Sequence, residues 1–395
     1  MTEKYKGLRK ATLLIASTLT VMAGAIVAPA LPQISKEFSD VPGIDLLSRL
    51  VLTLPALFMG ILAPLAGYLT DKAGRKKVLL FSLVLYAFAG TSGLYLNNLY
   101  HILAGRAILG IAVGALITSV ITLIGDYFEG EERSRFMGLQ AAFAGMGGLI
   151  FISLGGVLAD INWRMPFSLY VASFIVWIMA VISVYEPFKD KNSRPDQIKG
   201  QKSTGKKVQI TPIIWAVYAI TFFSALIFYM IPTQMPFMLN AMEGISNTRI
   251  GFAIAFVNVA SVSTSLNYSK VKRRMSYPAI MALVYLLVFT GFMIISQSGS
   301  YVMMIVGIVF SGLGFGLMMP NINLWLISLA PSAMRGQLVG YLNMSLFLGM
   351  FGSPIAIQPL LRLGDLYNVF FLLAILIFVL GIFFLIYNKL KQQIL

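Results

Sequence analysis

Twelve long apolar segments dominate this sequence and restrict it to a membrane fold. Each holds about 17–25 mostly apolar residues between polar breaks, which is the length of a helix that crosses a bilayer. Only 11% of the 395 residues are charged, and a water-soluble protein of this length could not cover its surface with so few charges. The sequence therefore predicts an all-α membrane protein. The expected segments are 11–31, 46–69, 78–96, 102–124, 136–158, 165–184, 212–235, 250–268, 277–295, 301–327, 338–361 and 367–387.

A long basic segment and an internal repeat divide the chain into two similar halves. Residues 187–211 are polar and basic, which is typical of a cytoplasmic linker near anionic lipid headgroups. Gly110 and Gly114 recur 202 residues later as Gly312 and Gly316, and Arg133 recurs as Arg335. Duplicated halves around a central site are a common transporter architecture. We therefore expect two pseudo-symmetric six-helix bundles, residues 1–186 and 212–395.

The placement of lysine and arginine predicts the orientation in the membrane. With both termini in the cytoplasm, cytoplasmic segments hold 24 of the 30 basic residues, as the positive-inside rule requires. We therefore expect an integral protein of the plasma membrane, the inner membrane of a bacterium, with the bilayer as its partner. The net charge of +15 is spread over loops, so a nucleic-acid partner is not expected.

The residue inventory argues against an enzyme and against a bound cofactor. The chain has no cysteine and one histidine, His101, so thiolate sites and sites with several imidazoles are excluded. The glycine-rich run from Gly312 to Gly316 lies in an apolar segment after no strand, so it does not predict a nucleotide loop. No Walker-type lysine loop is present, so transport driven by ATP is not expected. We expect no metal and no cofactor.

The loop after the second apolar segment carries a specific motif. It reads Gly67-Tyr-Leu-Thr-Asp71-Lys72-Ala-Gly74-Arg75-Lys76-Lys77, in which Gly67 permits a close helix approach and Gly74 a tight turn. This loop closely resembles the G-x-L-x-D-x-x-G-R-[RK] signature of the major facilitator superfamily. The resemblance implies two bundles around a central cavity, alternating access, and a charge cluster of Asp71, Arg75 and Asp126 that locks the outward-facing state. A basic topology anchor without a gating role is the alternative.

Two further motifs resemble the drug:proton antiporter branch of that superfamily. Arg106 lies inside an expected membrane segment and begins the pattern R-x-x-x-G that ends at Gly110 and is followed by Gly114. The resemblance implies a role in proton coupling or anion binding, whereas snorkelling to the interface is the alternative. The fifth segment has Gly147, Gly155 and Gly156 of the antiporter motif, but Phe151 and Ile152 replace its Gly-Pro. Helix packing explains these glycines equally well.

No acidic residue falls inside an expected membrane segment, which bears on the cargo. A lipophilic cation would lack its usual counter-charge, so a neutral, zwitterionic or anionic molecule fits better. Buried amides need hydrogen-bond partners in lipid and are candidates to line a cavity, although bonds between helices would also satisfy them. The candidates are Gln140, Gln234, Asn258, Asn321, Asn323 and Asn343.

These patterns predict a secondary transporter that acts as a monomer on a small molecule. The favoured function is efflux of drug-like or amphipathic compounds, with the proton gradient as the energy source of an antiporter. Import or facilitated diffusion of a metabolite or organic anion is the second hypothesis, and the missing core acids and the incomplete fifth-segment motif favour it. A membrane receptor on the same fold is the third.

Overall fold

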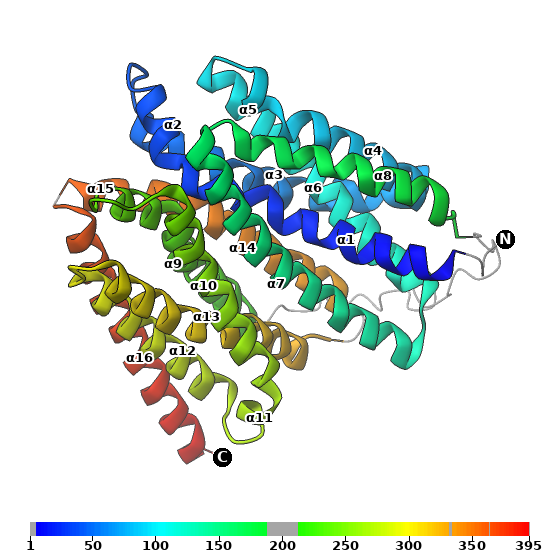
Figure 1. Cartoon of the computed structure of the whole chain (residues 1–395). Coiled ribbons are helices and arrows are strands. Elements are labelled where there is room, and N and C mark those ends of the chain that lie inside the picture. The colour runs from blue at the N-terminus through cyan, green and yellow to red at the C-terminus, as the bar shows by residue number, and fades with distance from the viewer. Residues whose placement is uncertain (1–4, 188–211, 332–333, 363, 395) are drawn as a thin grey trace.

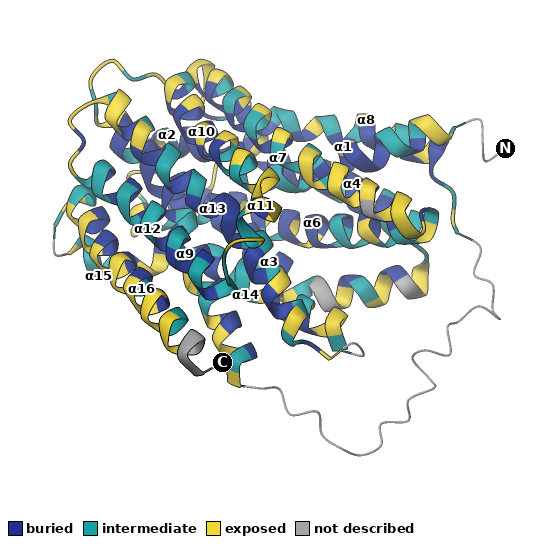
Figure 2. Cartoon of the chain, turned by 90° about the horizontal axis from the view of Figure 1, so that it is seen from below, coloured by how far each residue is buried: buried dark blue, intermediate teal, exposed yellow. Residues whose placement is uncertain are grey.

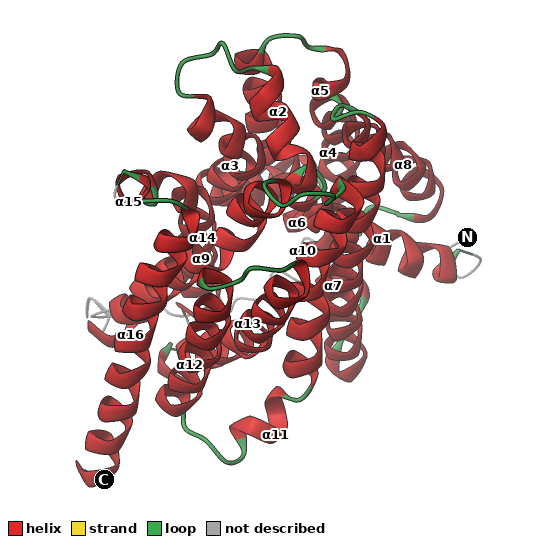
Figure 3. Cartoon of the chain, turned by 60° about the vertical axis from the view of Figure 1, so that its left-hand side comes forward, coloured by secondary structure: helices red, strands yellow, loops and turns green. Residues whose placement is uncertain are grey.

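The protein is described here from a computed structural model that covers residues 5–187, 212–331, 334–362 and 364–394. Within these ranges every regular element is a helix (Figure 3), as the apolar segments predict. Residues 188–211, nearly all of the expected linker, lie outside the described ranges, as do the side chains of Asp71 and of residues 391–394. The expected linker and the boundaries drawn from it stay predictions.

The first half contains six membrane-spanning segments, two of which include a short break. The first span consists of α1, η1 and α2, and its helix is interrupted near Pro29 and Pro32. The second span is α3, and the third consists of α4 and the short α5. The elements are α1 Lys6–Ala25, η1 Ala28–Ala30, α2 Leu31–Glu37, α3 Ile44–Ala73, α4 Arg75–Gly90, α5 Ser92–Tyr95, α6 Leu99–Tyr127, α7 Gly130–Ile161, η2 Met165–Val171 and α8 Ala172–Ser183.

The second half repeats this arrangement with six more spans. Three of its helices begin at serine caps, because the hydroxyls of Ser246, Ser276 and Ser300 accept bonds from otherwise unpaired N–H groups in the first turns of α10, α12 and α13. The elements are α9 Pro212–Asn240, α10 Asn247–Leu266, α11 Tyr268–Lys272, α12 Tyr277–Ser296, α13 Tyr301–Leu329, α14 Arg335–Ala356, α15 Gln358–Leu361 and α16 Leu366–Ile394.

Twelve helical segments within the described ranges are long and apolar enough to span a membrane. Figure 2 shows that many of their outward-facing residues are exposed, and the exposed set includes large apolar side chains such as Phe81, Leu266 and Phe383. Apolar side chains are stable on the outside of a helix bundle when lipid surrounds it. The expected all-α membrane fold is confirmed.

The helices pack as two bundles that meet along two helix pairs. In Figure 1 the helices coloured blue to green form the upper bundle, and those coloured light green to red form the lower one. The largest contacts between the bundles are those of α7 with α10 and of α3 with α14. We call the end where α1 and α4 begin and α16 ends the terminal face, and the opposite end, with α2, α5 and α15, the far face (Figure 1).

Glycines allow the helices to approach closely, within a bundle and between bundles. A Cβ at Gly110 of α6 would lie 2.8 Å from Cα of Pro55 in α3, which real Cβ atoms do not tolerate. At the bundle interface, a Cβ at Gly251 of α10 would lie 3.1 Å from Cα of Gly156 in α7. Close packing of this kind replaces the hydrophobic effect as a driving force inside lipid.

We expect Gly110→Ala to destabilise the protein by about 1–3 kcal/mol, because the added methyl group forces α6 and α3 apart. Gly138→Ala is the matched control, since nothing lies within 4 Å of its Cβ position in α7 and alanine favours a helix. Thermal unfolding of the two purified variants in detergent measures the difference. Equal unfolding midpoints would show that α6 and α3 are not in close contact.

Candidate functional site

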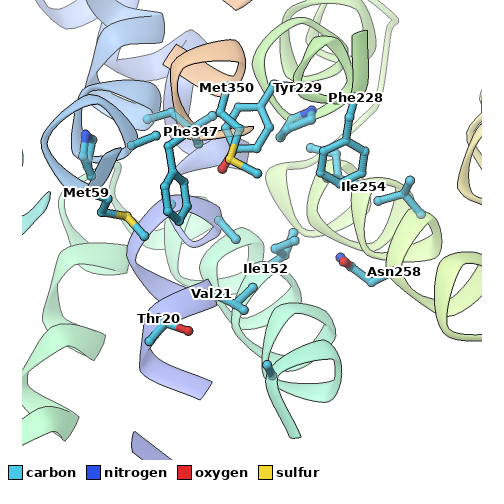
Figure 4. A pocket seen from close by; sticks show the side chains of 18 of the residues that line it. Thr20, Val21, Met59, Ile152, Phe228, Tyr229, Ile254, Asn258, Phe347 and Met350 are labelled. Atoms are coloured by element: carbon cyan, nitrogen blue, oxygen red, sulfur yellow. The ribbon is translucent and has the colours of Figure 1, made fainter. Parts of the chain in front are cut away.

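A cavity of about 370 Å³ lies between the two bundles, near the middle of the helices (Figure 4). Seven helices supply its wall, four from the first bundle and three from the second, and none of the lining side chains carries a charge. The lining residues are Thr20, Val21, Gly24, Ala25, Leu52, Pro55, Ala56, Met59, Ile117, Ala144, Ile152, Phe228, Tyr229, Pro232, Ile254, Val257, Asn258, Phe347 and Met350. A mostly apolar cavity with few polar groups is typical of a small-molecule site.

Three side chains supply the polarity of this wall. The hydroxyl of Thr20 is occupied, because it donates to the carbonyl of Ser17 at 2.7 Å. The amide of Asn258 and the hydroxyl of Tyr229 form no hydrogen bond with another described residue and point toward the cavity (Figure 4). These two groups are therefore free to bond a guest molecule.

An arginine joins the bundles at the far face. Nε of Arg49 in α3 donates to Oε1 of Gln234 in α9 at 2.8 Å, and its guanidinium stacks on the ring of Phe237 at 4.1 Å. Arg49 is 5% exposed, so water screens these contacts little. Arg49 lies within α3, five residues after this helix begins at Ile44.

A carboxylate makes a second connection at the far face. Asp160, near the end of α7, accepts hydrogen bonds from the backbone N–H groups of Asn247 at 2.7 Å and Thr248 at 3.0 Å. These N–H groups begin α10, where the helix dipole attracts negative charge. Asp160 therefore caps a helix of the other bundle. We call Arg49, Gln234, Phe237, Asp160 and the start of α10 the far-face clasp.

The terminal face has no comparable closure among the described residues. Nothing lies within 4 Å of the Cβ positions of Gly138 in α7 and Gly340 in α14, and Leu139 and Tyr341 beside them are 44% and 43% exposed. Farther from the terminal face the same two helices are buried, α7 at Gly156 and α14 at Gly349. The two bundles are thus in contact at the far face and separated at the terminal face.

Arg106 is completely buried and bonds to three elements of the first bundle. Nε donates to the carbonyl of Val51 at 2.7 Å, one Nη donates to the hydroxyl of Tyr170 at 2.8 Å, and the other donates to the carbonyl of Ala23. The residue is 0% exposed, so the snorkelling alternative is wrong. Arg106 does not line the cavity, and its role in coupling or anion binding stays a prediction.

Proline explains why Val51 needs this donor. In a regular helix the carbonyl of Val51 would accept from the N–H of residue 55, but Pro55 has none. Arg106 supplies the missing donor from α6. The carbonyl of Ala23 lies at the end of α1, where helical bonds also run out. This carbonyl also accepts from the hydroxyl of Tyr170 at 3.0 Å. A cation inside lipid is tolerated here because it bonds backbone carbonyls that lack helical donors.

Two members of the expected charge cluster lie together at the terminal face. Nε of Arg75 is 2.9 Å from Oδ2 of Asp126, but the N–H is not aligned for a hydrogen bond, so the contact is an ion pair. The close helix approach expected at Gly67 is not found, because no described atom lies within 4 Å of its Cβ position. The side chain of Asp71 lies outside the described part, so the three-residue cluster stays a prediction.

Glu186 holds this loop in place, a role that the sequence alone did not indicate. Its two carboxylate oxygens accept from the backbone N–H groups of Arg75 at 2.7 Å and Lys76 at 2.9 Å, which caps α4. Gly74 has φ +104°, and a Cβ there would lie 3.0 Å from this carboxylate. The motif therefore needs a glycine for its backbone conformation and for the space that Glu186 fills.

The candidate amides lie in different places. Of the six, Asn258 is the one found among the cavity residues, whereas Gln234 belongs to the far-face clasp. Asn321 is buried and bonds Tyr268 and the carbonyl of Tyr277, away from the cavity lining. Asn323 donates to the carbonyl of Met319 in its own helix. Gln140 is half-buried and Asn343 exposed, both toward the terminal face.

The glycines of α7 and α6 lie at helix contacts. A Cβ at Gly147 would be 2.7 Å from Cβ of Thr18 in α1, and Gly155 is in contact with Ile26. Gly114 is less crowded, with Cα of Met59 at 3.6 Å from its Cβ position. Contacts as close as that at Gly147 agree with the packing interpretation of the fifth-segment motif.

We expect Arg106→Lys to lower the unfolding midpoint, because one ammonium group cannot reach acceptors on three elements. Pro55→Ala restores an N–H for the carbonyl of Val51. The destabilisation caused by Arg106→Lys should therefore be about 1 kcal/mol smaller in the Pro55→Ala background. Thermal unfolding of the single and double variants measures this coupling. Strictly additive effects would contradict the pairing of Arg106 with Val51.

We expect Arg49→Met to open the far face, because it removes a buried charge-assisted bond between the bundles. Thr20→Cys places a single thiol in the cavity of this cysteine-free chain. A membrane-impermeant maleimide, added to the far-face side of sealed vesicles, should label it about tenfold faster in the Arg49→Met background, as expected for the loss of about 1.4 kcal/mol. Glu243→Gln, a far-face acid outside the clasp, is the control. Equal labelling rates in all three backgrounds would exclude the clasp.

Proteins of similar sequence include some that are named as exporters or drug-resistance proteins. The bacillibactin exporter of Bacillus subtilis strain 168 is 24% identical over 350 residues, which cover 85% of each chain. The quinolone resistance protein NorA of Staphylococcus aureus is 28% identical over 192 residues, 48% of this chain and 49% of that protein. These relatives confirm the resemblance to bacterial drug exporters.

Solved structures share the fold at low identity. A bacterial homologue of the human lysosomal transporter Spinster, in an inward-facing and occupied conformation, has a TM-score of 0.78 at 13% identity and 98% coverage of both chains. The D-xylose–proton symporter has a TM-score of 0.76 at 14% identity, with 96% of this chain and 97% of that chain covered. The sequence profile of the Major Facilitator Superfamily matches residues 13–354. The protein therefore belongs to the Major Facilitator Superfamily and is a membrane transporter.

Proposed function

We propose that this transporter exports small, uncharged amphipathic molecules from the cytoplasm by alternating access. The observation that carries the proposal is the cavity between the bundles, which is apolar except for a few hydrogen-bonding groups. The names of the relatives, which include an exporter and a drug-resistance protein, support the direction. The cavity is built from one chain, so we propose that a monomer is the working unit.

The chemistry of the wall favours an uncharged cargo. Phe228, Phe347 and Met350 offer aromatic and flexible apolar surface, which accepts varied shapes. Asn258 and Tyr229 offer a donor and an acceptor for a single polar group. A lipophilic cation would lose its hydration without gaining a carboxylate partner, because no lining residue is acidic.

The distribution of charge supports an orientation with the terminal face toward the cytoplasm. The basic residues of the α3–α4, α11–α12 and N-terminal segments all lie at this face, as expected for cytoplasmic loops. The arrangement with the terminal face open is then the inward-facing state, which would load cargo from the cytoplasm.

Release on the far side requires the two faces to exchange roles. The far-face clasp would break, and the bundles would close at the terminal face near Arg75 and Asp126. Arg75 and Asp126 are already paired while the terminal face is open, so we propose that Asp71 joins them in the second state and that the complete cluster stabilises it. Glu186 would hold the loop in position through the backbone of α4.

We propose proton exchange as the energy source, because the sequence contains no nucleotide-binding loop. A specific observation favours uncoupled movement of an organic anion as the second candidate. Arg106 bonds the carbonyl of Ala23, next to Gly24, and Gly24 faces the hydroxyl of Tyr229. A fixed positive charge therefore lies close behind the cavity wall and would favour an anion there.

A proteoliposome assay separates the two candidates. With an imposed pH gradient, an uncharged amphipathic dye should move from the terminal-face side, and an internal pH indicator should report protons moving in the opposite direction. Flux of an organic anion without a proton signal would replace the exporter by a uniporter. A failure of both cargo types to move would contradict both candidates.

We expect Asn258→Leu to lower the affinity for an uncharged amphipathic cargo about tenfold, through the loss of one buried hydrogen bond of about 1.5 kcal/mol. Asn323→Leu is the matched control, because this amide bonds within its own helix. Equilibrium binding of a fluorescent cargo to both purified variants measures the effect. Equal affinities would remove Asn258 from the binding site.

A further inference from the structure

A basic hollow lies at the terminal face of the second bundle, apart from the cavity. It has a volume of about 470 Å³ and lies where α11 leads into α12. Lys270, Arg273 and Arg274 supply its cations, and the apolar part of its wall comes from Val271, Met275 and Leu283. The hollow therefore combines cationic and apolar side chains in one wall.

The positive charge of this hollow has no counter-charge in its own bundle. Between residues 212 and 395 the sequence contains two acids, Glu243 and Asp365, and both follow or precede a helix at the far face. No ion pair involves Lys270, Arg273 or Arg274 among the described residues, although Lys270 bonds the side chain of Asn267 at 2.9 Å. Three neighbouring cations repel one another unless an anion joins them.

The first bundle shows how the same region is neutralised when acids are present. There Arg75 pairs with Asp126, and Glu186 caps the loop. The residue 202 positions after Asp126 is Ser328, at the end of α13. The repeat has thus kept the basic loop and lost the acid that would pair with it.

The geometry points to an anionic phospholipid as the occupant of this hollow. Arginine and lysine side chains bind phosphate through charge-assisted hydrogen bonds, and Lys270, Arg273 and Arg274 would hold the headgroup phosphate. Leu283 lies in α12, one of the membrane-spanning helices, so the apolar wall continues toward the acyl-chain region. A free phosphate would use the cations but would leave the apolar wall exposed to water.

Lys272 lies between Lys270 and Arg273 in the sequence and provides a control. Its Nζ lies 3.9 Å from the centroid of the Tyr277 ring and donates to the carbonyl of Met275 at 3.2 Å. Lys272 is not among the residues that line the hollow. Loss of its charge should therefore leave lipid binding nearly unchanged, although it lies as close to the membrane.

Lipid titration of the purified full chain tests the proposal, with retained lipid counted by native mass spectrometry. Phosphatidylglycerol should bind more tightly than phosphatidylcholine, and Arg273→Gln with Arg274→Gln should weaken the tight site about thirtyfold, whereas Lys272→Gln should change it less than threefold. Lipid-free unfolding midpoints check that each variant is folded.

Three outcomes would overturn the proposal. The double variant could bind phosphatidylglycerol as tightly as the unchanged protein, or Lys272→Gln could weaken binding equally, which would indicate general surface charge. Inorganic phosphate or glycerol phosphate could displace the lipid at comparable concentrations, which would make the site one for a soluble anion. The assay involves no transport, so its failure leaves the proposed function untouched.

Discussion

The hydrogen bonds that Arg106 donates inside the first bundle are the interaction on which the cavity depends. Pro55 and the end of α1 leave two carbonyls without helical donors, and in lipid no water can replace them. Arg106 donates to both and to the hydroxyl of Tyr170, which in turn donates to the carbonyl of Ala23. The irregular backbone of α1 and α3 is thereby stabilised, and these two helices supply Thr20, Gly24 and Pro55 to the cavity wall.

The same rule explains why few polar contacts can control a large rearrangement. Contacts where the bundles meet include glycine and apolar side chains, as at Gly156 with Gly251 and Gly60 with Phe347, and such contacts can separate without leaving polar groups unpaired. The far-face clasp adds directional bonds at two points, Arg49 with Gln234 and Asp160 with the start of α10. Because these bonds are few and lie near the far-face ends of the helices, water can take their place when they break.

The two halves share a backbone plan but differ in electrostatics. In the first half Arg75 of the α3–α4 loop pairs with Asp126, and Glu186 caps the backbone of the loop. In the second half the corresponding loop is basic without nearby acids in its own bundle. Duplication preserves helix length and packing, which depend on many residues, whereas the charge balance of a loop depends on a few positions, such as Asp126 in one half and Ser328 in the other.

The sequence by itself determined the twelve spans, the fold and the family, because hydropathy over about 20 residues and a loop motif are local properties. The sequence also indicated Asn258, Gln234 and Arg106 as candidate functional residues, but it could not predict where each lies in the fold. Whether an amide faces a cavity, a clasp or its own helix depends on how each helix is rotated against its neighbours. Contacts such as Arg49 with Gln234, 185 residues apart, and the cap that Glu186 provides arise only when the helices pack, so only the tertiary structure decided them.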